Sequence, residues 1–292
     1  MELIVSLSDI EHLKRLKDGE VSGIIYGSMF SDKYNFDLNE LVQIDDFCLK
    51  NNIKRYISVD SFINESDKKD LYSYFEIIKK LNPDGIYFSD LGVYNCAKGY
   101  ELEDRMIYDP DTLMTNSLDV GFYLSQGIDV VLARELCLDE VLGILKKYPG
   151  QIDMQIFGHL RMSRSKRKFL SNYFKEINKL VEVRNKNTLS LIEESRAYNL
   201  PIVETKNGTN IYTDYILLIY DELPYLMPLI KRGIIDSSFV ESKLLFNVIG
   251  DIKRISKDNA SFMKEALIDK FKDYSFSEGY FYRKTVNRKD GE

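Results

Sequence analysis

Short apolar runs alternate with longer amphipathic stretches through the first half of the chain. The apolar runs have the length of buried strands, and the amphipathic stretches carry apolar residues at helical spacing. Strands are predicted at Leu3–Val5, Gly23–Tyr26, Lys54–Val59, Gly85–Phe88, Arg105–Tyr108, Val130–Leu132 and Ile152–Phe157, where Gly158 can break the last one. Helices are predicted at Ser8–Lys17 with Ser8 as N-cap, Leu38–Lys50, Ser66–Leu81, Leu91–Gly99, Ser117–Gln126 and Leu138–Tyr148.

This alternation predicts an α/β fold. Short buried strands separated by helices pair in parallel through right-handed crossovers, and eight such units close a TIM-type (β/α)8 barrel. Seven units are complete by the strand at Ile152. The rest is predicted as a helix at Asp221–Arg232, an eighth strand at Ile234–Val240, helices at Lys243–Ile255 and Ala260–Phe271, and a frayed tail at Tyr274–Arg288.

The rhythm breaks between the seventh and eighth strands. The pair Asn207-Gly208 is a strong hairpin signal, because both residues tolerate the backbone angles of a tight turn. Short antiparallel strands are predicted around it at Val181–Arg184, Ser190–Glu193, Pro201–Thr205 and Thr209–Thr213. We therefore expect residues 1–292 to form one barrel domain, with an inserted basic segment and β-hairpin region at about 158–215.

Composition narrows the class of protein. The chain has 292 residues, of which 44% are hydrophobic, and a net charge of −6, which argues against wholesale coating of nucleic acid but allows a local basic patch. The three cysteines, Cys48, Cys96 and Cys137, lack the short paired spacing of metal ligands, so we expect reduced thiols and no metal or other cofactor. No stretch has the pattern of a signal peptide or a membrane span, which predicts a cytoplasmic protein.

The densest positive charge follows the seventh strand. Five cations lie within eight residues, ahead of the aromatic residue Tyr173: Arg161, Arg164, Lys166, Arg167 and Lys168. Arginine can grip a phosphate or carboxylate in two places and lysine adds a point charge, so the segment suits an anion. A solvated basic face is the alternative.

Active sites of such barrels lie at the carboxyl ends of the strands, where further polar residues follow. Arg134 and Glu135 come directly after a buried strand, where adjacent charges are costly unless they are paired or used, so a rim salt bridge and catalysis are both open. The other residues in such positions are Asp60, Asp90, Asp109, Asn116 and Glu241. His159 lies near the seventh strand's end, but a lone histidine without a matched acid or nucleophile is a weak catalytic signal.

Several stretches resemble the collagenase-like peptidase U32 family, and particularly its short branch in low-GC Gram-positive bacteria. They are Ala133-Arg134-Glu135-Leu136, IFGHLRM with SRSKRKFLSNYF, and, in the same order along the chain, YISVDSFIN, IYDPDTLMTN, PIVETKNGTNIYT and SEGYFYRKTV. The resemblance implies a TIM-type barrel with a small inserted β region. Family members often have histidine where this chain has Phe157, cysteine where it has Arg161 and asparagine where it has Asp60, and the cysteines that bind an iron-sulfur cluster in several relatives have no counterpart here.

The resemblance implies two conflicting functions. The family is named for peptidases. The short branch, however, resembles a protein that works with a longer homologue to make 5-hydroxyuridine at the tRNA wobble position, a modification for which prephenate is implicated as a small-molecule requirement. We therefore expect a subunit in tRNA wobble-uridine 5-hydroxylation, working with a longer U32 homologue and binding tRNA or an acidic small molecule such as prephenate at the barrel mouth.

Specific residues are expected to serve the tRNA-hydroxylation function. Arg134, Glu135 and Glu241 are the catalytic candidates, Asn116 is expected to supply a hydrogen bond, and Tyr173 to stack on a base. The basic segment holds the anion. The alternatives are a collagenase-like peptidase that depends on Glu135 or Glu241, and a barrel that binds a metabolite without catalysis.

Overall fold

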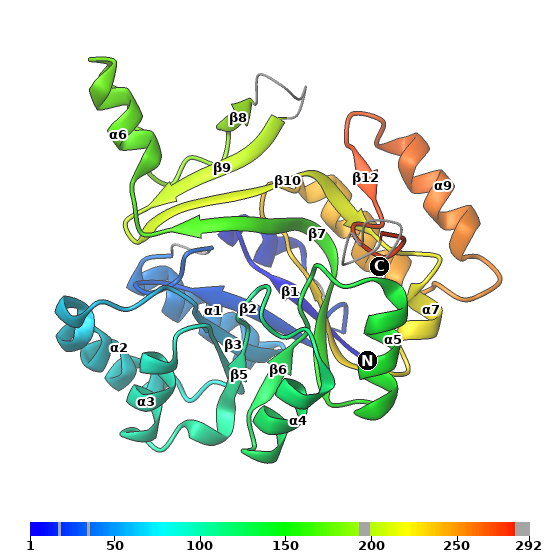
Figure 1. Ribbon diagram of the computed structural model, residues 1–292, viewed down its shortest axis with the longest axis horizontal. Helices are drawn as coiled ribbons and strands as arrows, with labels where there is room; N and C mark the ends of the chain where they lie inside the picture. The colour runs from blue at the N-terminus through cyan, green and yellow to red at the C-terminus, as the bar shows by residue number, and fades with distance from the viewer. Residues whose placement is uncertain (17–18, 34–35, 193–198, 284–292) are drawn as a thin grey trace, which may run out of the picture.

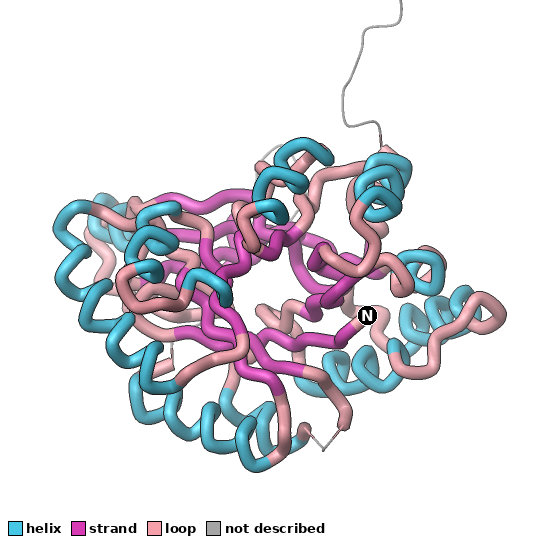
Figure 2. The backbone as a smooth tube through the Cα atoms, turned by 90° about the horizontal axis from the view of Figure 1, so that it is seen from below, coloured by secondary structure: helices cyan, strands magenta, loops and turns pink. Residues whose placement is uncertain are grey.

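A closed parallel barrel forms the body of the computed structural model, which describes all residues except 17–18, 34–35, 193–198 and 284–292. The strands run in the order β11-β1-β2-β3-β4-β5-β6-β7, and β7 also pairs with β11, so that the sheet closes on itself (Figure 2). They are β1 (Glu2–Ser6), β2 (Gly23–Gly27), β3 (Lys54–Val59), β4 (Gly85–Phe88), β5 (Met106–Tyr108), β6 (Asp129–Val131), β7 (Ile152–Ser165) and β11 (Ile230–Ile235). The predicted TIM-type fold is confirmed.

Helices cover the outside of the barrel (Figure 2). Those that alternate with strands are α1 (Leu38–Lys50), α2 (Lys68–Leu81), α3 (Leu91–Lys98), α4 (Ser117–Ser125), α5 (Leu138–Lys147) and α8 (Ser242–Ile252), followed by α9 (Ala260–Lys270). Their predicted positions are confirmed to within three residues at each end. Asp37 caps α1 by accepting hydrogen bonds from the backbone N–H of Asn39 and Glu40, as a capping box requires.

The first predicted helix is wrong in type and in cap. The structure has a 3-10 helix, η1 (Ile10–Arg15), whose N-cap is Asp9. Ser8 does not cap it because its hydroxyl donates to the carbonyl of Ser237, 3.1 Å away, and thereby joins the ends of β1 and β11. Two further 3-10 turns are η2 (Glu65–Asp67) and η3 (Glu103–Arg105).

The seventh strand does not end at Phe157 as predicted. Gly158 adopts a φ of +109°, yet β7 continues past it and pairs antiparallel with β10 (Gly208–Leu218), which places Leu217 opposite Gly158. The upper half of β7 thus leaves the barrel and joins an inserted sheet with β9 (Asn199–Thr205) and β8 (Ser190–Ile192), as Figure 1 shows above the barrel. The hairpin predicted at Asn207-Gly208 is confirmed.

A β-bulge lies in this upper half of β7. Arg161 is opposite Tyr212 and Ser163 is opposite Ile211, so Met162 has no residue across from it. Side chains three positions apart point to opposite faces of a regular strand. The extra residue reverses this alternation and lets Arg161 and Arg164 face the same side.

The other corrections concern the second half of the chain. The predicted helix at Asp221–Arg232 shrinks to one turn, α7 (Leu223–Leu226), because Pro228 lacks the N–H that a continued helix needs. The eighth barrel strand accordingly starts earlier than predicted. Val181–Arg184 forms only a single bridge, between Arg184 and Glu204, and part of the predicted tail forms β12 (Phe276–Ser277) beside β10. Within the described residues, no helix is long and apolar enough to cross a membrane.

Substitutions at two glycines test the close backbone contact between Gly158 and Asp236. A Cβ on Gly158 would lie 2.3 Å from the carbonyl oxygen of Asp236, whereas one on Gly143, in the middle of α5, would meet no atom within 4 Å. Gly158→Ala is expected to lower the free energy of unfolding by at least about 2 kcal/mol. Gly143→Ala is expected to raise it by about 0.5–1 kcal/mol, because alanine favours helix. Urea denaturation measures both, and a Gly158→Ala protein as stable as its parent would contradict the close approach.

Candidate functional site

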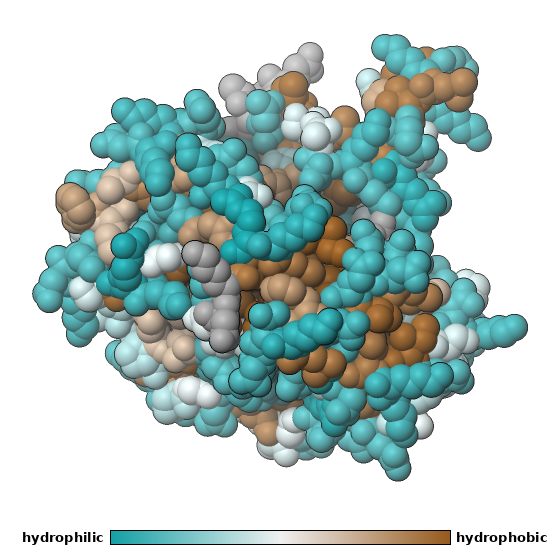
Figure 3. All heavy atoms as spheres, turned by 180° about the vertical axis from the view of Figure 1, so that it is seen from behind, coloured by the Kyte–Doolittle hydropathy of each residue, from teal (hydrophilic) through white to brown (hydrophobic). Residues whose placement is uncertain are grey.

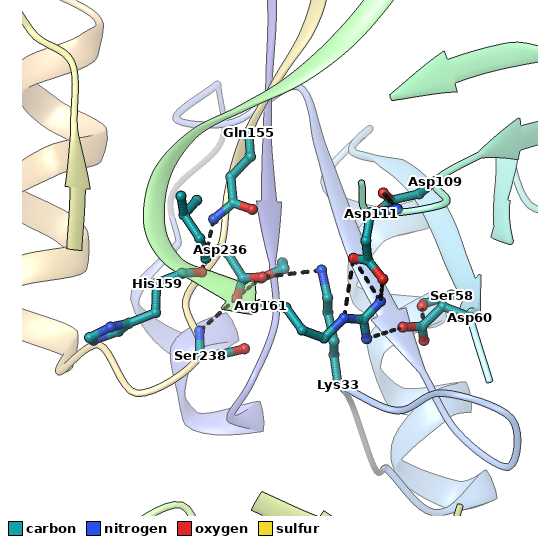
Figure 4. Close-up of polar contacts among 12 residues, drawn as sticks. Lys33, Ser58, Asp60, Asp109, Asp111, Gln155, His159, Arg161, Asp236 and Ser238 are labelled. Carbon is teal, nitrogen blue, oxygen red and sulfur yellow. Dashed lines mark hydrogen bonds and ion pairs between the residues drawn. The ribbon is translucent and has the colours of Figure 1, made fainter. Parts of the chain in front are cut away.

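Charged side chains from six strand ends meet at the mouth of the barrel, and Figure 4 shows Lys33, Asp60, Asp111, Arg161 and Asp236 among them. The carboxylates are those of Asp60 after β3, Asp109 and Asp111 after β5, and Asp236 after β11. The cations come from the segments after β2 and β6 and from β7 itself: Lys33, Arg134, Arg161 and Arg164. The mouth is therefore a network of buried opposite charges.

Arg134 is paired inside this network, as one of the two sequence interpretations proposed. Its guanidinium contacts Asp109 Oδ2 at 2.9 Å, Asp111 Oδ1 at 3.1 Å and the amide oxygen of Gln155 at 2.7 Å. Its side chain is only 6% exposed. Every edge of the guanidinium is used within the protein.

Arg161 lies deepest, with 2% of its side chain exposed. Nη1 donates to Asp60 Oδ2 at 2.8 Å, and Nη2 donates to both oxygens of Asp111, at 2.9 and 2.7 Å. Buried charges are stable only with such pairing. The loops after β3 and β5 are thus both tied to β7 by one side chain.

Arg164, three residues after Arg161 on β7, is the third arginine of the mouth. It donates to the backbone carbonyl of Asp60 at 2.6 Å and to the hydroxyl of Ser89 at 3.2 Å. Its guanidinium lies over the ring of Phe62, 3.7 Å from the ring centre, which is a favourable cation–π contact.

The carboxylates differ in their proton affinity. Burial alone would raise the pKa of Asp60, but Arg161, Lys33 and Arg164 hold it below its usual range. Asp32, beside it, has the opposite balance: burial and the negative charge of Asp60 raise its pKa to about 6. Asp32 is thus the acid of the mouth that titrates nearest neutral pH among those with a shifted pKa in the described residues.

Sequence reasoning missed Lys33, Asp111 and Asp236. Lys33 and Asp236 face each other across the centre of the mouth, with 3.4 Å between Nζ and Oδ2, and both side chains are nearly fully buried. Asp111 stands two residues after Asp109 and adopts a φ of +61°, which aspartate tolerates better than most residues. The acidic pair flanking Pro110 was the available signal for it.

A pocket of about 710 Å³ opens between the mouth and the inserted sheet. Lys33, Glu241 and Phe239 line it from the barrel, and Asn185 and Tyr212 line it from the insertion. Phe239 has a φ of +61°, which bulky residues rarely adopt, and its ring is held edge-on against Tyr212 with 5.0 Å between the centroids. Such strain occurs often in binding loops.

The other predicted site residues do not all converge on this pocket. Glu135 is exposed on the rim of the mouth and does not line the pocket, whereas Glu241 is exposed and lines it. Asn116 is the N-cap of α4, where its side-chain oxygen accepts from Leu118 and Asp119 N–H. His159 is buried, its Nδ1 lies 2.7 Å from the carbonyl oxygen of Thr213, and burial lowers its pKa.

The end of the basic segment leaves the mouth altogether. We call residues 166–186 the arm; it includes α6 (Phe169–Glu176), which stands clear of the body in Figures 1 and 3. Lys166 Nζ is bonded to the carbonyl oxygen of Phe62 at 2.7 Å and to Asp67 at 3.0 Å. Arg167 and Lys168 are exposed, and 58% of Tyr173 is exposed. The five cations therefore divide into a paired group and an exposed group.

Metal ligation has no cluster to support it in the part of the chain that the structure describes. No group of three or more His, Cys, Asp or Glu side chains is arranged there to hold an ion. Cys48 and Cys96 are buried on helices, and Cys137 is the N-cap residue of α5.

Comparison with known proteins gives related sequences over most of the chain. The profile of Peptidase family U32 matches residues 23–289. The tRNA hydroxylation protein P2 of Bacillus subtilis is 24% identical over 270 residues, which cover 86% of each chain. The tRNA hydroxylation protein P1 of the same organism is 24% identical over 177 residues, covering 59% of this chain and 42% of that protein.

Two further relatives carry protease names. An uncharacterized protease of Methanocaldococcus jannaschii is 29% identical over 182 residues, covering 59% of this chain and 44% of that protein. A solved U32 peptidase structure has a TM-score of 0.49 and 13% identity, covering 82% of this chain and 93% of the other.

Removing the deepest cation tests the network. Arg161→Leu leaves Asp60 and Asp111 without their main partner in a buried site, and is expected to lower the free energy of unfolding by about 3–5 kcal/mol. The control Arg167→Leu, at an exposed position, is expected to change it by less than about 0.5 kcal/mol. Equal stability of the two variants in urea denaturation would refute the structural role of Arg161.

Asp32 gives the mouth a pH dependence. Its folded pKa of about 6 lies above its usual value of 3.8, so the folded state holds a proton that the unfolded state has lost, and this contribution to stability disappears as pH rises through 6. Asp32→Asn removes the titration. The stability of the parent relative to this variant is expected to fall by about 1 kcal/mol between about pH 5 and pH 8. A pH-independent difference in urea midpoints would show that Asp32 titrates normally.

Proposed function

The chain belongs to Peptidase family U32, and on that premise we propose that it is a cytoplasmic subunit in tRNA wobble-uridine 5-hydroxylation that works with a longer homologue of the family. The similarity to tRNA hydroxylation protein P2 carries the proposal, because it extends over 86% of both chains. The second subunit in this proposal is a protein like P1, which has 42% of its own length matched by this chain.

The arm is the proposed RNA contact. Between residues 166 and 186 the sequence has seven basic and two acidic side chains, in a protein whose net charge is −6. Arg167 and Lys168 are exposed where phosphates can reach them, and the exposed ring of Tyr173 is available to stack on a base. The foot of α6 is fixed, because the backbone N–H of Ser171 donates to buried Glu204 at 3.1 Å.

The pocket above the mouth is the proposed site for an acidic small molecule. Arg134, Arg161 and Arg164 are already paired, so in this proposal they hold the mouth in shape and do not bind the ligand directly. Lys33 lines the pocket, and its ion pair with Asp236, at 3.4 Å, leaves donors of its ammonium group to meet the ligand's negative charge. Glu135 and Glu241 stand at the rim of the mouth and of the pocket, respectively, where they can contact a bound substrate.

The salt dependence of tRNA binding tests the arm. Replacing both Arg167 and Lys168 with alanine removes two phosphate contacts, so binding is expected to weaken, and the plot of log K against log salt is expected to become less steep by about 1–2. Fluorescence titration of labelled tRNA at several salt concentrations measures both quantities.

The matched control replaces Lys50 and Lys80 with alanine. Both are exposed lysines at the C-terminal ends of helices, opposite the barrel mouth, so this variant should bind tRNA like its parent. Equal loss of tRNA affinity in the two double variants would refute the proposal that the arm contacts RNA. Cleavage of denatured collagen by the purified protein, lost in Glu135→Gln or Glu241→Gln, would favour the peptidase alternative instead.

A further inference from the structure

A second, smaller pocket lies on the barrel loops beside the upper half of β7. Its volume is about 290 Å³. It is lined by Phe62 from the loop after β3, Pro110 and Leu113 from the loop after β5, and Met162 from the bulge of β7. Among the described residues, it shares no lining residue with the larger pocket above the mouth.

Three of these side chains are unusually exposed for apolar residues in a shared hollow. Phe62 is 38% exposed, Met162 48% and Leu113 65%. The bulge is the reason that Met162 is there, since it is the residue of β7 without a partner on β10. Exposed apolar groups gathered around a concave site mark a place where an apolar group of a ligand or partner binds.

Polar groups complete the pocket. Arg164 stacks on one face of the Phe62 ring, 3.7 Å from the ring centre, which holds the ring in place while 38% of Phe62 stays exposed as a stacking platform. The hydroxyls of Thr112 and Ser163 line the walls and can each donate or accept a hydrogen bond. Unpaired bases are commonly held by stacking on aromatic rings or guanidinium planes.

The pocket is directly connected to the arm. Lys166, the first residue of the arm, donates to the backbone carbonyl of Phe62 at 2.7 Å, and exposed Arg167 and Lys168 follow it. A strand of RNA whose phosphates contacted these two cations would pass beside the ring of Phe62. We propose that this pocket receives one unpaired nucleobase of a single-stranded RNA segment, which rests on the proposed RNA-binding role and gives it a base subsite.

The test uses synthetic RNA hairpins that carry 2-aminopurine at successive loop positions. With the parent protein, the fluorescence of one loop position should change on binding, because that base leaves its neighbours and stacks in the pocket. Phe62→Ala should abolish this signal and weaken binding roughly tenfold or more, with an unchanged salt slope, since no phosphate contact is lost.

Three variants separate stacking from damage to the fold. Phe62→Trp keeps a flat ring and should retain the signal. Leu113→Ser removes an exposed wall that has no part in the ionic network and should also weaken binding. Phe262→Ala, which removes a 74% exposed ring from α9, is the matched control and should bind like the parent.

The outcomes are distinguishable from those of the proposed function. Salt-sensitive RNA binding that is unaffected by Phe62→Ala and Leu113→Ser overturns the base pocket alone, and absence of RNA binding by the parent overturns both proposals. Binding of a fluorescent denatured-collagen peptide that is lost in Phe62→Ala, with RNA binding unchanged, assigns the pocket to a peptide side chain and also overturns the inference.

Discussion

The ion pairs of Arg161 with Asp60 and Asp111 are the interaction on which the upper part of the molecule depends. Nη1 lies 2.8 Å from Asp60 and Nη2 lies 2.7 Å from Asp111, in a site with almost no solvent. A buried guanidinium is stable only if its donors are used, so the two loops and β7 must keep their relative positions together. The inserted sheet grows from this same strand and is therefore fixed over the barrel by the pairs at its base.

Two backbone features make that geometry possible. Gly158 lets β7 pass so close to Asp236 that a Cβ has no room, and the strand can then exchange its barrel neighbours for β10. Higher up, the bulge at Met162 turns Arg161 and Arg164 to the same side, where both lie within 3.6 Å of Asp111. The bulge also exposes Met162 itself, so one irregularity closes the ionic network on one side and shapes a pocket wall on another.

The barrel was predictable from the sequence because each strand and helix carries its own periodicity. The position of Lys54–Val59 and the hairpin at Asn207-Gly208 follow from local pattern alone. The length of β7 was not predictable, since a glycine that ends one strand and a glycine that admits a close backbone contact look the same in a sequence. Nor was the partnership of Lys33 with Asp236, because it joins residues about two hundred positions apart through barrel closure.

The same limit governs how the basic segment is understood. From the sequence alone the five cations are interpreted as one anion site. In the structure some of them lie on β7 inside the mouth, and others lie beyond the end of the strand. Arg161 and Arg164 face carboxylates that outcompete any ligand anion for their donors, because they are preorganised and buried. Arg167 and Lys168 lie past the end of the strand, in solvent. Free positive charge at this end of the barrel therefore lies on the arm and not in the mouth, so the arm suits a polyanion that reaches over the rim. A small anion in the pocket is left with Lys33, whose ammonium group keeps donors beyond its ion pair with Asp236.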